Sequence, residues 1–234
     1  MIRGIIFDYG GTIDTCGEHW SDVIYRGWCH VGIEITPEIF RSAYVYGERS
    51  LAAPGVVLPT DNFRDTLSKK IDKEFEYISK FCPTLNFNKK IGTRSAVKSI
   101  VDYCYNTARA VTTSNLRTLE ELAKKYTLGV VSNFYGNLRT VLADFGLEKV
   151  FQCIVDSAVV RIRKPDARIF ELCLMQMRLE PSETMVVGDS YKNDIIPAQT
   201  LGCHTFQITP QNTVEAIGNF LYTIQNPQTD SQCV

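Results

Sequence analysis

Short runs of apolar residues recur along the chain, and each run is followed at once by small or polar residues. The clearest runs cover residues 4–7, 128–131 and 184–187. Continuous apolar segments of this length are typical of strands that are buried on both faces, as in a parallel sheet covered by helices. We therefore predict that these three segments are strands of one buried sheet.

Helical patterns lie between the predicted strands. In residues 115–125 three leucines recur on one face of a helix, and Ser114 is a suitable N-cap residue. Residues 166–178 repeat the same apolar spacing. This alternation of strands and helices predicts an α/β fold with a doubly wound, Rossmann-like parallel sheet, in which ligands bind beyond the carboxyl ends of the strands.

The long stretch between the first two predicted strands has a different character. Helical spacing recurs there in four segments, residues 20–29, 37–51, 63–81 and 98–109. No strong strand pattern interrupts these segments, and the last one is expected to return the chain to the sheet. We predict an all-helical cap domain at residues 15–108, inserted into an α/β core made of residues 1–14 and 109–234.

Charge and composition exclude several classes of protein. The 25 Lys and Arg residues nearly balance the 26 Asp and Glu residues, so no large basic surface for nucleic acid or an anionic membrane is expected. The longest basic runs are only pairs, Lys69-Lys70 and Lys89-Lys90, which are typical of a solvated helix face. No apolar run approaches the roughly 20 residues of a membrane span, and the start of the chain has no signal-peptide pattern.

The eight cysteines are scattered, without the spacing of a metal site. We expect them to be reduced, with several buried as small apolar residues. Together with the charge balance, this pattern predicts a soluble, cytoplasmic protein that binds neither nucleic acid nor membrane.

Polar residues stand at the ends of the predicted strands and in the loop before one helix. The segments are DYGGT at 8–12, SN at 132–133, KP at 164–165 and GDSYKND at 188–194. Each segment alone is a weak signal, because an aspartate after a strand is often a helix cap. In this order the segments resemble the four motifs of the haloacid dehalogenase-like superfamily, and the helical insertion is similar to the first type of cap in that superfamily.

The resemblance implies that the protein transfers a phosphoryl group from a small phosphorylated substrate. Asp8 would be the nucleophile and would form a covalent aspartyl intermediate. Ser132 would donate a hydrogen bond to the phosphoryl group, and Lys164 would neutralise charge on both the nucleophile and that group. Asn133 is a further candidate for substrate contact, although it could instead shape the loop after Ser132.

The resemblance also implies a magnesium site. Asp8, the backbone carbonyl of Gly10 and Asp189 would bind Mg²⁺, which prefers a few carboxylate and carbonyl oxygens together with water. Asp194 would lie behind these ligands and orient Lys164 or a metal-bound water. The alternative for Asp194 is an ordinary helix N-cap.

One position departs from the family pattern. Phosphatases of the superfamily usually carry a second aspartate two residues after the nucleophile, which protonates the leaving group and then activates water. In this chain that position is Gly10. Its backbone carbonyl remains available to a metal, but general acid–base assistance is missing, and such assistance is typically worth roughly 10²–10⁴ in rate.

The departure at Gly10 leaves three functions open. The first is a Mg²⁺-dependent phosphatase that acts on good leaving groups or takes a proton from the cap, where His19 is the first candidate. The second is a phosphonate-cleaving or dehalogenase-like enzyme. Phosphonate-cleaving members use a lysine of the cap, and no cap lysine stands out in this sequence. Dehalogenases use no metal, so the metal-binding pattern around Asp189 argues against a dehalogenase. The third is a catalytically weak, phosphate-binding regulatory protein.

Overall fold

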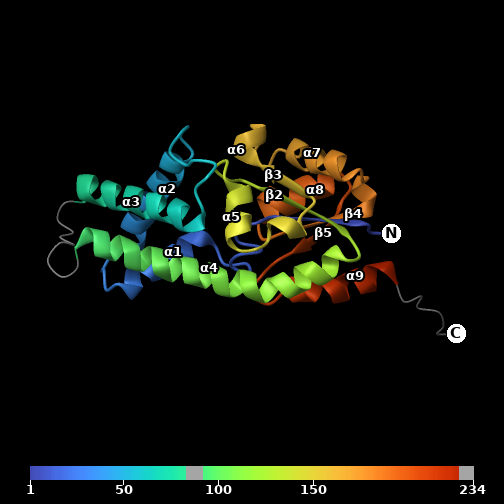
Figure 1. The fold of residues 1–234 in the computed structure, drawn as a ribbon, viewed down its shortest axis with the longest axis horizontal. Coiled ribbons are helices and arrows are strands. Elements are labelled where there is room, and N and C mark those ends of the chain that lie inside the picture. Colours follow the sequence, from blue (N-terminus) through green and yellow to red (C-terminus); the bar gives the residue numbers. More distant parts are fainter. Residues whose placement is uncertain (83–91, 227–234) are drawn as a thin grey trace.

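The centre of the protein is a five-stranded parallel sheet, seen in a computed structural model that describes residues 1–82 and 92–226 (Figure 1). The strands are β1 (Gly4–Phe7), β2 (Thr127–Ser132), β3 (Cys153–Asp156), β4 (Thr184–Gly188) and β5 (His204–Gln207). Their spatial order is β3-β2-β1-β4-β5, and every neighbouring pair is parallel. The predicted doubly wound α/β fold is confirmed, and the three predicted strands are its central ones.

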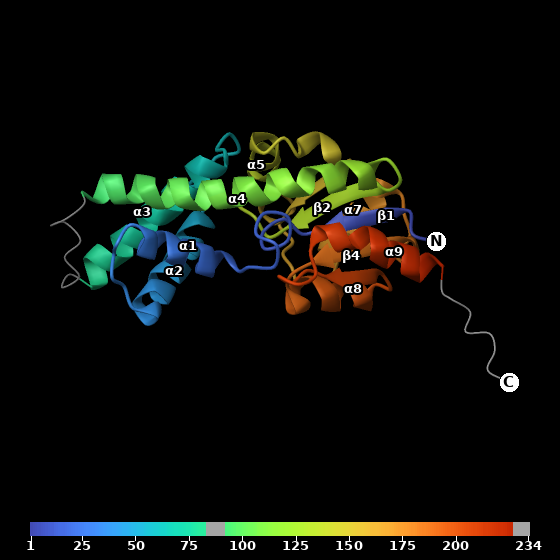
Figure 2. The ribbon, with the colours of Figure 1, turned by 90° about the horizontal axis from the view of Figure 1, so that it is seen from below.

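Helices surround the sheet, some on its two faces and others beyond the ends of its strands. They are α1 (Trp20–His30), α2 (Pro37–Leu51), α3 (Phe63–Phe81), α4 (Thr93–Ala123), α5 (Leu138–Asp144), α6 (Ser157–Val160), α7 (Arg168–Met177), α8 (Ile196–Thr200) and α9 (Ile217–Gln225). Figures 1 and 2 show α4 and α9 on one face and α7 and α8 on the other. Side chains of β1 alternate accordingly: Ile5 and Phe7 belong to the apolar cluster of Leu119, and Ile6 to that of Phe170.

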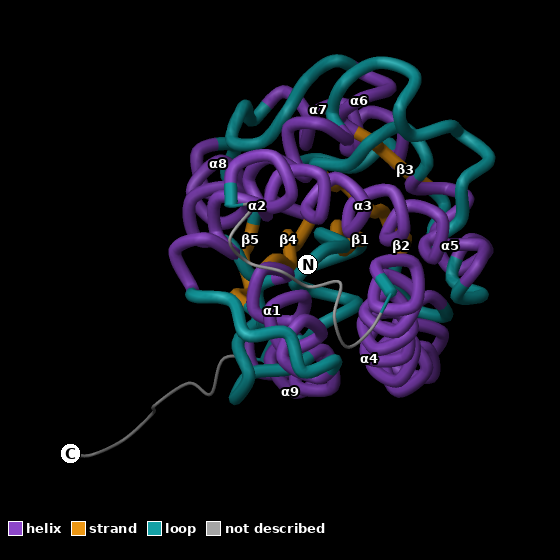
Figure 3. Tube along the Cα trace, turned by 90° about the vertical axis from the view of Figure 1, so that its left-hand side faces the viewer, coloured by secondary structure: helices purple, strands orange, loops and turns teal. Residues whose placement is uncertain are grey.

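A helical region lies beyond the carboxyl ends of the strands. It consists of α1, α2, α3 and the N-terminal half of α4, and Figure 3 shows these helices in front of the sheet. Its described residues contain no strand. The boundary at residue 108 falls inside α4, so the helical region and the sheet share this helix, and the division into two domains stays a prediction.

Helix α4 differs from the sequence expectation. Two helices were expected, at residues 98–109 and 115–125, with Ser114 as the N-cap of the second. The structure has one helix of 31 residues, with Ser114 in its interior, so the N-cap prediction is wrong. No Gly or Pro interrupts it. The Thr112 hydroxyl donates to the carbonyl of Ala108 at 2.9 Å within the helix, and the β-branched stretch does not end it.

Within the described residues no helix combines the length and the apolar character of a membrane span. The seven cysteines in this part of the chain are unpaired, and four of them are buried. Cys233 and the pair Lys89-Lys90 lie outside the described residues.

Three charged side chains lie inside the helical region, where α2 and α3 pack together: Lys70 and Glu74 are buried, and Glu48 is partly exposed. Lys70 forms an ion pair with Glu48, so the prediction that Lys70 lies on a solvated face is wrong. One turn further along α3, Glu74 accepts a hydrogen bond from Trp28 Nε1 at 3.0 Å, and its Oε1 has no hydrogen-bond partner among the described residues. Burial raises the pKa of Glu74 to about 7, and Lys70 only partly opposes this.

This raised pKa predicts a pH dependence of stability. Below its ordinary pKa of 4.5 Glu74 is protonated in both states, whereas between 4.5 and about 7 the unfolded chain ionises first and the folded state loses stability. Glu74→Gln removes that loss and keeps an acceptor for Trp28. Its free energy of unfolding relative to wild type should therefore rise from pH 4.5 to pH 7, by up to about 3 kcal/mol.

Urea denaturation at several pH values measures this difference, and Glu120→Gln on the exposed side of α4 is the matched control. That substitution removes a solvated carboxylate and should leave the difference flat. A Glu74→Gln curve that runs parallel to wild type at every pH would contradict the assignment.

Candidate active site

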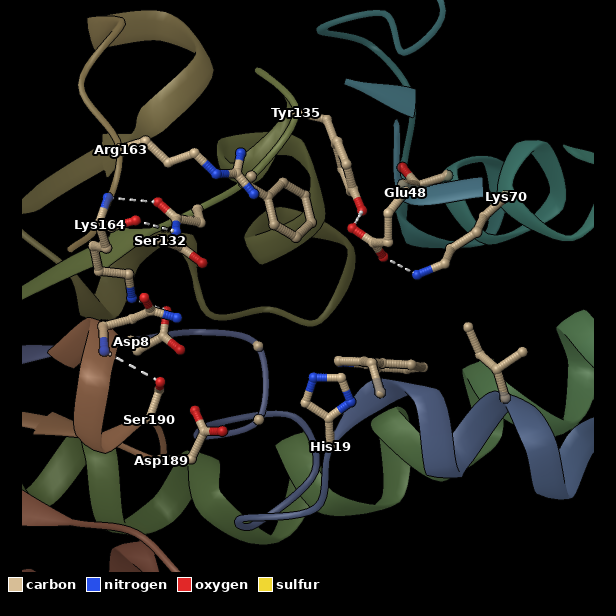
Figure 4. A pocket seen from close by; sticks show the side chains of 18 of the residues that line it. Asp8, His19, Glu48, Lys70, Ser132, Tyr135, Arg163, Lys164, Asp189 and Ser190 are labelled. Carbon is tan, nitrogen blue, oxygen red and sulfur yellow. Dashed lines mark hydrogen bonds and ion pairs between the residues drawn. The ribbon is translucent and has the colours of Figure 1, made fainter. Parts of the chain in front are cut away.

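A cavity of about 490 Å³ separates the carboxyl ends of the central strands from the helical region. This volume is within the range of roughly 300–1,000 Å³ that is usual for small-molecule sites. Figure 4 shows Asp8, Ser132, Lys164 and Asp189 at the sheet end of the cavity and Glu48 and Lys70 at the opposite end. The strand ends therefore meet at one site, as the sequence pattern predicts.

The sheet end of the cavity is a buried cluster of three carboxylates and one ammonium group. Asp8 follows β1, Asp189 follows β4, and Asp194 lies in a single π-helical turn, Tyr191–Ile195. Oxygen atoms of the three carboxylates lie within 4.8 Å of one another. Lys164 Nζ donates to Asp8 Oδ1 at 2.7 Å, to Asp194 Oδ1 at 2.6 Å and to the carbonyl of Val131 at 3.2 Å.

Two glycines allow these carboxylates to come so close to the backbone. A Cβ atom at Gly188 would lie 2.5 Å from the side chain of Asp194. A Cβ atom at Gly11 would lie 2.5 Å from the carboxylate of Asp189, and Gly11 has a φ of +91°, which side-chain-bearing residues rarely adopt. The two glycines are therefore part of the site, and Gly11 does more than turn the chain after β1.

The charges of the cluster are out of balance. Burial alone would lower the pKa of Lys164, but Asp8 and Asp194 raise it above its ordinary value, so the side chain stays protonated. Burial, and then the charges of Asp8 and Asp194, raise the pKa of Asp189. One ammonium group thus offsets only part of the negative charge.

The pattern of hydrogen bonds leaves two carboxylates available to a cation. Both oxygens of Asp194 already accept hydrogen bonds, one from Lys164 Nζ and one from the Ser190 amide at 3.0 Å. Among side-chain hydrogen bonds of the described residues, Asp8 accepts through Oδ1 alone, and Asp189 accepts one, from Thr12 at 3.2 Å. Hard oxygen ligands of this kind fit Mg²⁺.

The last residue of β2 and the first residue of the loop after it are the next two predicted residues. Ser132 is buried with 3% of its surface exposed and lines the cavity. Asn133 also lines the cavity, but its amide is paired with the backbone of Lys164: Nδ2 donates to the carbonyl at 3.0 Å, and Oδ1 accepts from the amide at 2.9 Å. Asn133 therefore holds the lysine-bearing loop against β2.

Asp14 is a buried carboxylate that sequence reasoning did not identify. It accepts hydrogen bonds from the amide of Gly11 and from Trp20 Nε1, both at 2.8 Å, and burial raises its pKa to about 8. Its position six residues after Asp8 gave no signal of this role. Asp14 is not among the residues that line the cavity, so it does not replace the carboxylate missing at Gly10.

The far end of the cavity is built from residues that the sequence did not reveal. They are Tyr44, Glu48, Lys70 and Tyr135, with Arg163 on the side of the sheet. Glu48 and Lys70 lie on different helices, and Tyr135 comes from the loop after β2, so no local pattern joins them. His19, which the sequence places near the junction, does line the cavity and projects into it (Figure 4).

Comparison with known proteins identifies the family. The sequence model described as haloacid dehalogenase-like hydrolase matches residues 67–208. The chain belongs to this family. The haloacid dehalogenase-like hydrolase domain-containing protein 3 of Mus musculus is 36% identical over 89 residues, which are 38% of this chain and 36% of that protein. A glyceraldehyde 3-phosphate phosphatase of Methanothermobacter thermautotrophicus is 33% identical over 103 residues, 44% of this chain and 45% of that enzyme.

The matched stretches thus span about a third to a half of these curated relatives. Solved structures of haloacid dehalogenase-like proteins share the fold over most of the chain. The magnesium-bound HAD-hydrolase YfnB of Bacillus subtilis has a TM-score of 0.55 and 16% identity, covering 96% of this chain and 99% of that one. A HAD family enzyme of Bacteroides thetaiotaomicron, in complex with magnesium and inorganic phosphate, has a TM-score of 0.54 and 18% identity, covering 88% and 94%.

The two adjacent glycines of the DYGGT segment should respond differently to a methyl group. Gly11→Ala forces an alanine to a φ of +91° and its Cβ into the Asp189 carboxylate, which should lower the free energy of unfolding by about 1–3 kcal/mol. Gly10→Ala is the matched control, because its Cβ would only touch Trp20 at 3.8 Å, and Gly10 is not left-handed. The loss at Gly10 should stay within about 0.5 kcal/mol. Equal losses in chemical denaturation would show that Gly11 is not constrained as described.

Proposed function

We propose that this haloacid dehalogenase-like protein is a Mg²⁺-dependent phosphatase that forms an aspartyl-phosphate intermediate on Asp8. The observation that carries the proposal is that Lys164 Nζ contacts both Asp8 and Asp194. The neighbouring Asp189 carboxylate still has oxygen lone pairs available to a metal ion. The cavity above this cluster is large enough for a small phosphorylated metabolite. The relative named as a glyceraldehyde 3-phosphate phosphatase supports a substrate of this class.

In the first step a carboxylate oxygen of Asp8 attacks phosphorus, and the bond from phosphorus to the ester oxygen breaks. Lys164 neutralises charge on the nucleophile before the reaction and on the phosphoryl oxygens during it. The Ser132 hydroxyl donates a hydrogen bond to the same group. In the second step water attacks the acyl phosphate, which releases inorganic phosphate and restores the Asp8 carboxylate.

Asp8, Asp189 and the backbone carbonyl of Gly10 would hold the metal. When bound, Mg²⁺ supplies positive charge that offsets the negative charge of the carboxylates and of the phosphoryl group. Asp194 positions Lys164, because its oxygens are already occupied by protein donors. Asn133 positions the backbone of the same lysine, and its predicted contact with substrate stays a prediction. The helical region would act as the cap that closes the site.

Protonation of the leaving group is the step for which this chain lacks the residue that the family usually provides. Gly10 has no carboxylate, and Asp14 does not line the cavity and is engaged by Gly11 and Trp20. We therefore expect slow hydrolysis of alkyl phosphates, whose leaving group needs a proton, and faster hydrolysis of aryl or acyl phosphates, whose leaving group does not.

Phosphonate cleavage would need a lysine from the helical region in the cavity, and Lys70 is such a lysine. However, Lys70 is paired with Glu48, and although burial alone would lower its pKa, Tyr44 and Glu48 raise it well above the ordinary value. A lysine must lose its proton to attack a carbonyl group. The ion pair therefore disfavours Schiff-base chemistry at Lys70 and leaves the phosphatase as the better-supported function.

The proposal predicts that turnover requires Asp8. With Mg²⁺, wild type should hydrolyse 4-nitrophenyl phosphate, and Asp8→Asn should reduce kcat by roughly 10³-fold or more because an amide does not form the acyl phosphate. Asp72→Asn on the exposed side of α3 is the control for the same chemical change and should keep wild-type turnover. Undiminished activity of Asp8→Asn would rule out the covalent mechanism, and inactivity of the wild type on aryl, acyl and alkyl phosphates would rule out a phosphatase.

The proposal also predicts a gain of function at Gly10. Gly10→Asp adds the missing proton donor at a position where a Cβ meets nothing closer than Trp20 at 3.8 Å. Turnover of an alkyl phosphate should rise by roughly 10²–10⁴, and that of an aryl phosphate by much less. Gly10→Asn has nearly the same shape but no titratable proton, so it should leave alkyl turnover low. If wild type already hydrolyses the alkyl ester at on the order of 10 per second, another residue donates the proton.

A further inference from the structure

The end of the cavity opposite Asp8 carries a second polar arrangement that the proposed chemistry does not use. Glu48 of α2 lies at its centre: Oε1 accepts from Lys70 Nζ, and Oε2 accepts from the Tyr135 hydroxyl at 2.7 Å. Lys70 also lies over the ring of Tyr44, with 3.9 Å from Nζ to the ring centroid. Glu48 is therefore held in one position by donors from α3 and from the loop after β2 (Figure 4).

The cavity meets the negative member of this ion pair more than the positive one. The side chain of Glu48 is 32% exposed, whereas that of Lys70 is 7% exposed. Glu48 and Lys70 are the charged residues that the helical region contributes to the lining, since Arg163 belongs to the sheet side. Burial alone would raise the pKa of Glu48, but Lys70, Tyr135 and Tyr44 lower it overall, so the carboxylate stays ionised. A second anionic group on a ligand would face this charge and be repelled.

Glu48 retains capacity to accept a hydrogen bond from a ligand. An ionised carboxylate has about four acceptor positions. Lys70 and Tyr135 occupy two of them and the Tyr44 side chain also hydrogen-bonds to Glu48, which leaves capacity for a ligand. A partly exposed, rigidly held acceptor selects ligands that carry a donor at this point. Hydroxyl and ammonium groups satisfy this requirement, and carboxylate, phosphate and alkyl groups do not.

His19 decides between the two kinds of donor. Its ring lies beside Tyr44, with 6.1 Å between the ring centroids, and projects into the same cavity. Nδ1 accepts a hydrogen bond from the Ser21 amide at 3.1 Å, which places the proton of the neutral ring on Nε2. The far end therefore offers an acceptor, Glu48, and a donor, His19. A hydroxyl group both donates and accepts, whereas an ammonium group only donates.

We propose that Glu48 is a specificity-determining residue, which accepts a hydrogen bond from a substrate hydroxyl and excludes substrates with a second anionic group at this end. The substrate class is then a hydroxylated phosphate monoester whose only anionic group is the transferred phosphate. This inference rests on the proposed function, which places the phosphate of the substrate at Asp8. It adds that the opposite end of the substrate carries a hydroxyl group and no charge.

The test is binding to the Asp8→Asn variant with Mg²⁺, so that turnover does not interfere. Three ligands with the same number of carbons are compared by calorimetry: glycerol 3-phosphate, propyl phosphate and 3-phosphoglycerate. Glycerol 3-phosphate should bind on the order of tenfold or more tighter than each of the others, which is the usual effect of a hydrogen bond to a charged group. Equal affinities, or tighter binding of 3-phosphoglycerate, would overturn the proposal.

Adding Glu48→Gln to the Asp8→Asn variant should change the preference in a stated direction. The amide removes the negative charge and leaves the charge of Lys70 without its partner, so 3-phosphoglycerate should gain affinity and glycerol 3-phosphate should lose it. Tyr135→Phe is the control, because it removes one hydrogen bond to Glu48 and keeps its charge, and rejection of 3-phosphoglycerate should persist. The same reversal in Tyr135→Phe would show that the loop position, and not the charge of Glu48, sets the preference.

If Glu48→Gln does not fold, the order of the three ligands on the Asp8→Asn variant still decides the question. The experiment is also separate from the test of the proposed function. Absence of phosphatase turnover in the wild type would contradict the reaction, whereas the order of the binding constants tests Glu48.

Discussion

Three carboxylates and one ammonium group are buried together where β1 and β4 end, and much of the surrounding structure serves to hold them there. Removing charged groups from water is costly unless each has partners. Lys164 provides one partner for Asp8 and one for Asp194, and Asn133 and the carbonyl of Val131 fix its position. The remaining negative charge would be offset by a bound cation, and hard oxygen ligands of this kind fit Mg²⁺.

The cavity joins this cluster to a second, partly buried ion pair, and the end of β2 with the loop after it contributes residues to both ends. Ser132, the last residue of β2, lines the cavity at its sheet end, and Tyr135, three residues later, donates to Glu48 in the helical region. The two ends differ in their charge: the sheet end has an excess of carboxylates, whereas Glu48 and Lys70 nearly compensate one another. A bound molecule would thus meet strong charge at one end and directional hydrogen bonds at the other.

The sequence predicted the features that depend on neighbours along the chain. Apolar runs placed the three central strands, and the polar residues at their ends converge because parallel strands end at one edge. It did not predict β3 and β5, since four-residue strands at the edges of a sheet carry little pattern. It also misjudged Lys70, because a lysine beside another lysine on a helix gives no sign that its partner is Glu48 on a different helix.

The length of α4 has a consequence for how the site can open. Its 31 residues extend about 46 Å, at about 1.5 Å per residue, as one unbroken rod from the helical region to the face of the sheet. Nearer its C-terminal end, Asn115 Nδ2 donates to the carbonyl of Ile13, only a few residues after Asp8. A stiff rod transmits displacement, so a rotation of the helical region either bends α4 or pulls on the segment that carries the nucleophile. Through this hydrogen bond, a movement of α4 that changed the width of the cavity would also act on the segment after Asp8.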